Sequence, residues 1–491
     1  MNLAVDRLKV AVFSLDHPAS ACWQIRVQSP FEFLRKELDF RRGSVPGPDG
    51  RNHHFAFPEV LEWADLFLVQ RLFPCESTWP LLERVIQQNK PLVYETDDLL
   101  ISIPVGNPVR SASVRGRPWI LKLMQKAGAL VVSTPEMKRM LAPYHRSIHV
   151  LPNLLDDRLW FQPPAQPSEA EPVVIGFAGT PTHLADLGFM DEALRRLQEK
   201  HGSRIHFLFM GCATDQNKDL PNFSFLPFQH SYEAYASGLK GAGIHIGLAP
   251  LADNAFNRCK SNIKWLEYSA CHMAGVYSDL PPYRACVRDG ETGLLVPNTS
   301  AAWFEALDAL VSEPSRRRDM ALRAHQEVAA HFSLSRRGQA YVDTYRALSA
   351  QGGRDIPRVA PTPSPGVPLP EALLHRPCWD KQDWVTILLS YLHGFSSGEP
   401  VTLIVPIGIS TGGHPSLDEL QDLISGLVSA IGQVESAAVL IVDGPTALEE
   451  ALQHFSRVQC LEVRPEGLAP LEGYFGERIA ESYKQIKSLR P

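Results

Sequence analysis

The feature that most constrains the fold is a repeated alternation of short apolar runs with longer amphipathic segments. The first block of such runs comprises Leu8–Leu15, Leu66–Gln70, Pro91–Tyr94 and Ala129–Ser133. A strand buried on both faces of a parallel sheet is a continuous apolar run, and a parallel connection needs a crossover long enough for a helix. The alternation therefore predicts a doubly wound α/β domain over residues 1–160.

A second block repeats the pattern after a break. Residues 162–172 are rich in Pro, Glu and Ala without apolar periodicity, which is typical of a linker. The apolar runs that follow are Val173–Phe177, Ile205–Met210, Phe223–Leu226 and Ile244–Leu248. We expect a second doubly wound domain over residues 172–335, followed by one further helix over residues 336–350.

The C-terminal part is separated by a stretch of chain that carries seven prolines, and we expect a stiff linker over residues 351–380. Residues 381–491 then predict a small α/β domain, because the pattern is strand, helix, strand, helix, strand. The strands are Val401–Ile407, Val439–Val442 and Val458–Val463, and the helices are Leu417–Ala430 and Ala447–Phe455. This domain has no phosphate-binding signature. A length of 491 residues agrees with about three domains.

Composition excludes several classes of function. The formal charge of −6 and the lack of a basic tract argue against nucleic acid as a partner. The eight cysteines include no C-x-x-C pair, which favours reduced thiols in the cytoplasm over a zinc site. No apolar run reaches the roughly 18 residues that span a bilayer. We therefore expect a cytoplasmic protein with at most peripheral association with the inner face of a membrane.

The stretch Ala249–Glu267 carries the strongest indication of a ligand. It follows an apolar strand, passes through a polar loop and enters a helix near Ser261. The first N–H groups of a helix are unpaired, and the helix dipole favours an anion at that end. Lys260 and Lys264 oppose the dipole, so a bound phosphate explains them better than helix stability does. Their spacing from Glu267 predicts one shared face, with the carboxylate placed for the ribose of a nucleoside diphosphate.

A glycine-rich turn follows the strand at Val173–Phe177. Gly179 and Thr180 would allow a phosphate or a sugar to approach the backbone closely. The indication is weak, because the spacing is not G-x-G-x-x-G and such turns often serve packing alone. His183 and Asp186 fall on one face of the next helix, where a histidine is more often a capping or core residue than a ligand.

Charged residues also follow the strands of the first domain. Arg26 precedes a helix that we expect at Pro30–Leu38, and Arg71 follows Leu66–Gln70. Open α/β sheets bind ligands at the carboxyl ends of their strands, so both arginines are candidates for a cleft. For Arg26, an ordinary surface arginine is an equally good interpretation.

A cluster of acids follows the strand Pro91–Tyr94. Glu95 begins it, and Asp97 and Asp98 end it. The aspartates could hold a sugar hydroxyl or act as a base toward an acceptor. The ordinary alternative, for one of the two, is an N-cap of the next turn.

Taken together, these residues resemble the retaining, GT-B-fold glycosyltransferases of group 1, especially those of bacterial surface-polysaccharide and O-antigen synthesis. The resemblance covers about residues 8–350. It rests on the segments Phe256-Asn257, Lys260-Ser261, Lys264, Glu267, Ser278-Asp279, Tyr283, Asp289-Gly290 and Gly293–Val296, together with Tyr94–Asp98, Ser133–Pro135 and Leu151–Asn153. It implies two facing Rossmann-like domains, with the sugar nucleotide on the C-terminal one and the acceptor mainly on the N-terminal one. The last helix, at residues 336–350, would cross back to the first domain.

The chemistry implied is transfer of a sugar from a nucleoside diphosphate sugar to a hydroxyl of a glycan or a lipid-linked acceptor, with retention. Positive groups would stabilise the diphosphate as it leaves, so neither a divalent metal nor a cofactor is expected. The expected donor-binding residues are Gly179, Thr180, His183, Asn257, Lys260, Ser261, Lys264 and Glu267. The expected catalytic residues are Asp97, Asp98 and Lys264, and the opposite wall of the cleft would carry Arg26, Arg71 and Glu95.

The sequence departs from the wider class at two places. Many members have two glutamates eight positions apart, and the position before Glu267 that would hold the first is Cys259. A common Gly-x-Pro turn is replaced by residues 272–274, His-Met-Ala. Two other classes of function therefore stay open. One is a nucleotide-sugar epimerase or a phosphorylase using the same two-domain cleft, and the other is a non-catalytic glycan-binding or scaffold subunit.

Overall fold

The computed structural model describes residues 7–47, 53–104, 107–161, 172–351, 371–375, 391, 401–407, 438–443, 457–461, 463–464 and 467–468. The chain divides into two compact units. The first comprises residues 1–100 and 119–358, and the second comprises residues 101–118 and 359–491.

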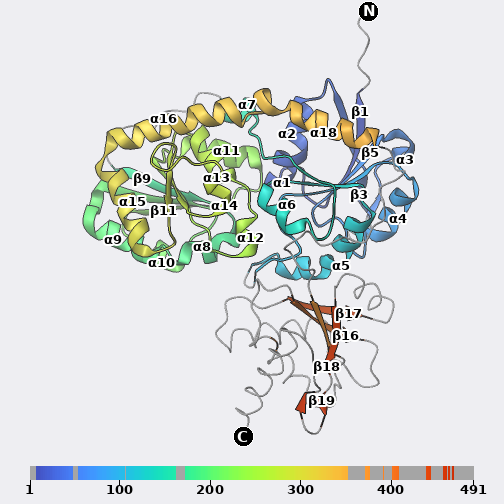
Figure 1. The fold of residues 1–491 in the computed structure, drawn as a ribbon. Coiled ribbons are helices and arrows are strands. Elements are labelled where there is room, and N and C mark those ends of the chain that lie inside the picture. Colours follow the sequence, from blue (N-terminus) through green and yellow to red (C-terminus); the bar gives the residue numbers. More distant parts are fainter. Residues whose placement is uncertain are drawn as a thin grey trace, which may run out of the picture. The chain divides into compact units, whose positions relative to one another are not determined.

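The first unit begins with a six-stranded parallel sheet in the order β2-β1-β5-β6-β7-β8 (Figure 1). The strands are β1 (Leu8–Phe13), β2 (Leu38–Arg42), β5 (Leu66–Gln70), β6 (Leu92–Thr96), β7 (Ala129–Val132) and β8 (Ile148–Val150). The chain passes from β1 to β2 on one side and then returns to β5 on the other side of β1. The carboxyl ends of β1 and β5 therefore form the switch point at which such sheets bind ligands.

The helices of this domain, together with a short hairpin, connect its strands. They are α1 (Ala21–Trp23), the π-helix η1 (Gln24–Gln28), α2 (Ser29–Phe33), α3 (Val60–Trp63), α4 (Trp79–Gln87), α6 (Pro135–Leu141) and α7 (Asp157–Trp160), with the hairpin β3 (Ser44–Pro46) and β4 (His53–Phe55). One more helix, α5 (Arg110–Lys126), begins in the second unit and ends in the first. The predicted helix at Pro30–Leu38 is too long, since α2 ends at Phe33 and Leu38 begins β2. This edge strand is half exposed and reads Leu-Asp-Phe-Arg-Arg, so it lacks the apolar run that identifies a central strand.

The second domain of this unit has a parallel sheet in the order β11-β10-β9-β12-β13-β14. Its strands are β9 (Val173–Ala178), β10 (Ile205–Met210), β11 (Phe223–Leu226), β12 (Ile246–Ala249), β13 (Ala274–Ser278) and β14 (Leu294–Val296). The direction of winding reverses at β9, so this switch point lies between β9 and β12. Sequence periodicity predicted this double winding because the four central strands are buried and apolar.

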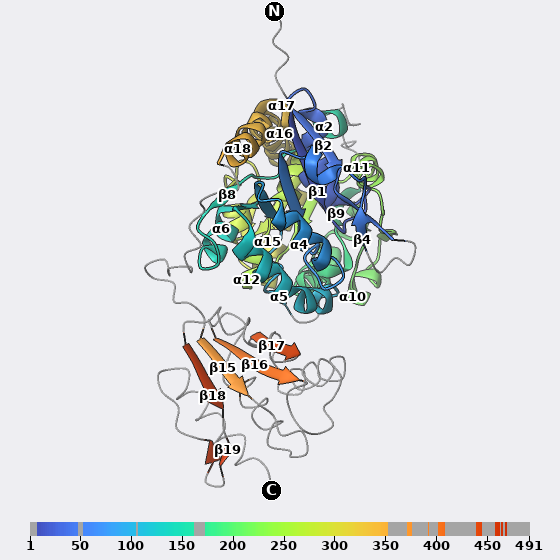
Figure 2. The same ribbon diagram turned by 90° about the vertical axis from the view of Figure 1, so that its right-hand side faces the viewer.

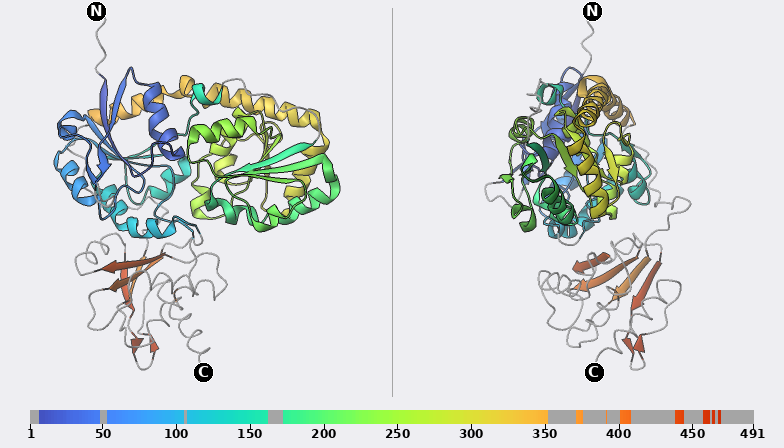
Figure 3. Two further views of the ribbon diagram at one scale, coloured as in Figure 1. Left: turned by 180° about the vertical axis from the view of Figure 1, so that it is seen from behind. Right: turned by 90° about the vertical axis from the view of Figure 1, so that its left-hand side faces the viewer.

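Helices lie on both faces of the second sheet (Figure 3). They are η2 (Pro181–His183), α8 (Leu184–Gly188), α9 (Asp191–His201), η3 (Gly202–Arg204), α10 (Asp215–Lys218), α11 (Tyr232–Gly241), α12 (Ala255–Arg258), α13 (Ile263–Ala270), α14 (Pro281–Arg284), α15 (Ser300–Ser312) and α16 (Pro314–His331). Two buried apolar clusters pack against this sheet, one centred on Phe207 and Trp303 and the other on Trp265 and Tyr268.

The chain passes between the two domains twice, and the two passages are hydrogen bonded to each other. The Leu155 amide donates to the Phe332 carbonyl at 2.8 Å, and the Leu334 amide donates to the Leu155 carbonyl at 2.9 Å. The Asp157 carboxylate also accepts from the amide of Ser335 at 2.9 Å and from its hydroxyl at 2.5 Å. The two passages therefore form one paired connection.

After the second passage, α17 (Leu334–Arg337) leads to α18 (Gln339–Ala350), which packs on the first domain. Tyr341, Val342, Tyr345 and Leu348 are buried in the core of that domain, and the Tyr345 ring centroid is 5.5 Å from that of Phe31. Figure 1 shows α16 along the second domain and α18 along the first.

The second unit contains a four-stranded parallel sheet in the order β17-β16-β15-β18 (Figure 2). Its strands are β15 (Glu371–His375), β16 (Val401–Ile407), β17 (Ala438–Asp443) and β18 (Arg457–Leu461), followed by the antiparallel pair β19 (Val463–Arg464) and β20 (Gly467–Leu468). Sequence interpretation placed 371–375 in the linker. These residues form β15 because they carry no proline and present an apolar run. The two helices predicted at 417–430 and 447–455 lie outside the described residues.

Among the described residues, no helix combines the length and the apolar character that a membrane span requires.

Candidate donor and acceptor site

The turns that follow β9 and β10 pack backbone against backbone. Gly211 has φ +88°, and a Cβ built on it would lie 2.2 Å from the Gly179 carbonyl oxygen. A Cβ on Gly179 would lie 2.6 Å from Cζ of Phe177. Packing alone therefore explains why Gly179 is a glycine, which was the ordinary alternative. Thr180 lies at the same carboxyl edge, where its hydroxyl is 2.6 Å from that of Thr182.

The loop after β12 ends at an uncapped helix N-terminus. The sequence predicted a helix beginning near Ser261, and α13 begins at Ile263. A separate short helix, α12, capped by Asn254, precedes it. Asn262 occupies the N-cap position of α13 without a capping hydrogen bond from its side chain, and the first turn holds no acid. Lys264 lies in that first turn. The site thus keeps the backbone donors and the positive charge that favour an anion.

Lys264 and Glu267 are brought together one turn into α13. The ammonium of Lys264 lies 3.1 Å from Oε2 of Glu267, whose side chain is only 2% exposed. The Tyr235 hydroxyl lies 2.7 Å from the same oxygen and 3.0 Å from the Lys264 ammonium, while the Tyr232 hydroxyl donates to Oε1 at 3.3 Å. Burial and the Glu267 carboxylate raise the pKa of Tyr235, so its hydroxyl stays protonated and donates. Both oxygens of Glu267 are therefore already engaged.

Tyr235 was missed as a site residue. The signal available was a pair of tyrosines three positions apart, Tyr232 and Tyr235, which α11 presents on one face. Their rings are stacked with centroids 6.0 Å apart.

His183 and Asn257 both contact the carboxylate of Asp186. Nδ1 of His183 is 2.8 Å from Oδ2 of Asp186, whose other oxygen accepts from Nδ2 of Asn257 at 2.9 Å. Burial lowers the pKa of His183, and Lys260 and Lys264 add to this, while the bond to Asp186 opposes it. A carboxylate only accepts, so the proton of the neutral ring is on Nδ1 and Nε2 is left as an acceptor.

On the first domain, Arg71 gathers three carboxylates. It pairs with Asp97, with Asp98 at 3.1 Å and with Asp16 at 3.4 Å. Its φ of +51° is unusual for a residue other than glycine, and such conformations cluster at functional sites. The Arg71 amide donates to the Glu95 carbonyl at 2.8 Å, which helps to hold this conformation. Sequence reasoning placed Arg71, Asp97 and Asp98 here but did not include Asp16.

Asp98 also contacts the second domain. Its Oδ1 lies 3.8 Å from the ammonium of Lys260. Burial alone would raise the pKa of Asp98, but Lys260 and Arg71 outweigh burial and lower it. The predicted face shared by Lys260 and Lys264 is not formed, because Lys260 precedes α13 and approaches the acids of the first domain.

Arg26 and Glu95 lie in the interior of the first domain instead of on the wall of a cleft. Their side chains are fully buried, and Nε of Arg26 is 2.7 Å from Oε1 of Glu95. The carboxylate points back into the protein because its strand, β6, is central and buried on both faces. Neither side chain is placed to touch an acceptor directly.

Within the described residues, no group of three or more His, Cys, Asp or Glu side chains is placed to hold a metal ion.

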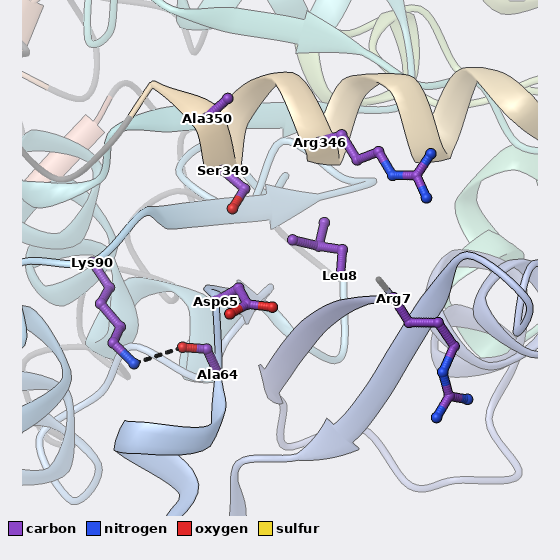
Figure 4. A pocket seen from close by; sticks show the side chains of 8 residues that line it. All are labelled: Arg7, Leu8, Ala64, Asp65, Lys90, Arg346, Ser349 and Ala350. Carbon is purple, nitrogen blue, oxygen red and sulfur yellow. Dashed lines mark hydrogen bonds between the residues drawn. The ribbon is translucent and has the colours of Figure 1, made fainter. Parts of the chain in front are cut away.

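A separate pocket of about 560 Å³ lies at the amino ends of the strands of the first sheet (Figure 4). It is lined by Leu8, Asp65, Lys90, Arg346, Ser349 and Ala350, among others. Lys90 donates to three backbone carbonyls, including that of Ala64 at 2.7 Å. Because Lys90 is already hydrogen bonded and the pocket lies at the edge opposite the switch point, this pocket is a weaker candidate than the carboxyl edge.

Comparison with known proteins gives a match to one family model. Residues 192–343 match a family model described as glycosyl transferase-like, and this range includes Lys260 and α13. The sequence matches no curated protein.

Three solved structures are similar to this chain. A sucrose-phosphate synthase from Thermosynechococcus elongatus is 15% identical with a TM-score of 0.50, covering 70% of this chain and 100% of that chain. HepE from Anabaena, in complex with UDP and glucose, is 15% identical with a TM-score of 0.48, covering 70% and 100%. A glycosyltransferase from Rickettsia africae is 11% identical with a TM-score of 0.48, covering 70% and 99%. The family match covers residues 192–343, and the likeness to the first of these structures shows a shared two-domain α/β fold.

Proposed function

We propose that the protein transfers a sugar from a nucleoside diphosphate sugar to a hydroxyl of a glycan or lipid-linked acceptor, with retention and without a divalent metal. The observation that carries this proposal is the uncapped N-terminus of α13, after β12 at the switch point of the second sheet. Lys264 lies in its first turn, and Lys260 and Ser261 directly precede its N-cap residue. A diphosphate there would meet backbone donors, two ammonium groups and a hydroxyl.

These groups would act mainly on the leaving group. Negative charge builds on the diphosphate as the bond to the sugar breaks, and fixed positive groups stabilise that charge without reorganising. Lys264 is held by Tyr235 and Glu267, so its ammonium is positioned before the substrate arrives. The neutral His183 offers Nε2 as an acceptor for a sugar hydroxyl.

The acceptor would lie against Arg71, Asp97 and Asp98. Their carboxylates can accept hydrogen bonds from hydroxyls of a sugar, while Arg71 fixes the carboxylates in place. Because the pKa of Asp98 is lowered, this residue is a hydrogen-bond acceptor and a weak base at neutral pH.

The test is release of nucleoside diphosphate from a panel of nucleotide sugars, with and without candidate acceptors, and with a chelator throughout. We expect release that requires an acceptor, continues in the chelator and gives a product whose anomeric configuration by NMR matches that of the donor. Turnover without an acceptor would indicate an epimerase or a hydrolase. Donor binding without turnover under any condition would indicate a binding subunit.

A further inference from the structure

A chain of polar contacts runs from the interior of the first domain to the loop at α13. The buried Arg26 pairs with Glu95, and its Nη1 lies 2.8 Å from Oδ1 of Asn153. Nδ2 of Asn153 then donates to the Ser261 hydroxyl at 2.9 Å, in the other domain. Asn153 is itself buried, whereas Ser261 is half buried.

The direction of each hydrogen bond follows from chemistry. A guanidinium only donates, so the Asn153 atom that faces Arg26 must be the oxygen. The atom that faces Ser261 is then the amide nitrogen, which also only donates. The Ser261 hydroxyl must accept from Asn153, and its single proton is left to point elsewhere.

That direction suits a ligand rich in oxygen. Ser261 lies between Lys260 and Lys264, at the start of α13, where we have proposed the diphosphate. A hydroxyl that already accepts one hydrogen bond is a better donor to the next group in a chain. Glu95 holds Arg26, and Arg26 in turn orients the Asn153 amide. The buried ion pair would therefore act on the ligand indirectly, through Asn153 and Ser261.

We propose that Asn153 is a positioning residue that turns the Ser261 hydroxyl into a hydrogen-bond donor to a diphosphate oxygen. This inference rests on the proposed function. It gives the Arg26–Glu95 pair, which the sequence placed beside the acceptor, an indirect role on the donor side.

The first test is the Asn153→Asp variant. Aspartate keeps the size of the side chain and the bond to Arg26, but the atom that faces Ser261 becomes an acceptor. The hydroxyl would then donate to Asp and turn its proton away from the ligand. A hydrogen bond to a charged group contributes about 1.5–3 kcal/mol, so we expect a ten- to hundredfold weaker affinity for nucleoside diphosphate.

The measurement is calorimetric titration with UDP, GDP, ADP and CDP, continued with whichever binds the wild type most tightly. The variants are Asn153→Asp, Ser261→Ala and the double variant. If Asn153 acts through Ser261, the double variant binds no more weakly than Ser261→Ala alone. We call this action of Asn153 through the Ser261 hydroxyl the relay. Additive losses of affinity, or wild-type affinity in Asn153→Asp, would overturn the relay.

Two controls separate this role from a structural one. Thr134→Val removes another hydrogen bond between the domains, that of the Thr134 hydroxyl to the Cys259 carbonyl at 2.9 Å, without touching Ser261. We expect it to bind diphosphate as the wild type does, and an equal loss would overturn the relay. The corresponding nucleoside, which lacks phosphate, should bind Asn153→Asp and the wild type equally, and a loss there would also overturn it.

If Asn153→Asp does not fold, Asn153→Ala takes its place. It frees the hydroxyl to rotate, and we expect a smaller loss that again disappears in the Ser261→Ala background; wild-type affinity in Asn153→Ala would overturn the relay. A wild-type protein that binds none of the four diphosphates overturns the proposed donor site and the relay together. A wild type that binds, with variants that do not differ from it, overturns only the relay.

Discussion

The ammonium of Lys260 lies 3.8 Å from the Asp98 carboxylate, so an ion pair joins the proposed donor side of one domain to the proposed acceptor side of the other. A diphosphate at α13 would compete with Asp98 for Lys260. Donor binding is therefore expected to release Asp98 from one of its two cations. Binding of the donor would thus leave the Asp98 carboxylate with less neutralising positive charge beside it when an acceptor binds.

Replacing Lys264 by alanine should weaken binding of nucleoside diphosphate at least tenfold, because the first turn of α13 loses its ammonium. The fold should persist, since the Tyr232 and Tyr235 hydroxyls still donate hydrogen bonds to the Glu267 carboxylate. Calorimetry measures the affinity. Lys218→Ala, which removes an exposed lysine paired with Asp215 on α10, is the matched control. Equal affinities in the two variants would contradict the assignment of Lys264 as a ligand.

The Tyr235→Phe variant tests how Lys264 is held. Loss of the hydroxyl removes a 2.7 Å hydrogen bond to a buried carboxylate and a 3.0 Å contact to Lys264. We expect the free energy of unfolding to fall by about 1–3 kcal/mol, together with a weaker donor affinity. Tyr232→Phe removes a longer bond to Glu267, of 3.3 Å, and should cost less in urea denaturation. The reverse order would show that Tyr232 is the main partner of Glu267.

Removal of Arg71 should destabilise the first domain in a manner that depends on pH. In Arg71→Ala, Asp16, Asp97 and Asp98 lose their shared cation, which we expect to cost about 3 kcal/mol at pH 7. The pKa of Asp98 is lowered in the folded state, so its stabilising contribution is complete above its unfolded value of about 4 and is lost as the pH falls below that. The difference from the wild type should therefore shrink in acid.

Arg71→Gly separates charge from backbone strain. It also removes the cation but relieves the positive φ, so it should be more stable than Arg71→Ala by about 1 kcal/mol. Urea denaturation of both variants at several pH values measures each effect. A difference from the wild type that stays constant with pH would mean that the carboxylates are not the source of the loss.

A histidine pair at the end of α13 should make the protein sensitive to acid. His272 and His325 stack with ring centroids 3.8 Å apart, and burial, with the charge of His325, lowers the pKa of His272 to about 4. A lowered pKa means that the unfolded chain takes up the proton first, so stability falls as the pH drops from about 6.5 toward 4. His272→Asn should flatten this fall, and asparagine tolerates the φ of +55° at this position. An unchanged slope in urea denaturation would exclude His272 as its source.

Much of the fold could be predicted because a buried parallel strand must be apolar. The strand Leu66–Gln70 has the bounds of β5, and Ile205–Met210 has those of β10. Leu38–Arg42 could not be found in this way, since an edge strand meets water and keeps polar residues.

The candidate site was predictable where chemistry is local and unpredictable where it depends on packing. The lysines beside Ser261 stand out because they oppose a helix dipole, which is a property of a few neighbouring residues. The interior position of Arg26 and Glu95 depends on a contact across 69 positions of chain, which periodicity does not encode. The same holds for Tyr235, whose partners lie 29 and 32 positions away.

The paired passages of the chain at Leu155 and Leu334 have a mechanical consequence. Two separate connections would let the domains slide and twist relative to each other. Because the two connecting segments are hydrogen bonded to each other, they define a single hinge axis, which we call the axle. We expect opening and closing to be rotation about that axle, with α18 carried as part of the first domain. Asn153 lies two residues from the axle, where a rotation moves atoms least, so its hold on Ser261 can persist while more distant contacts between the domains open.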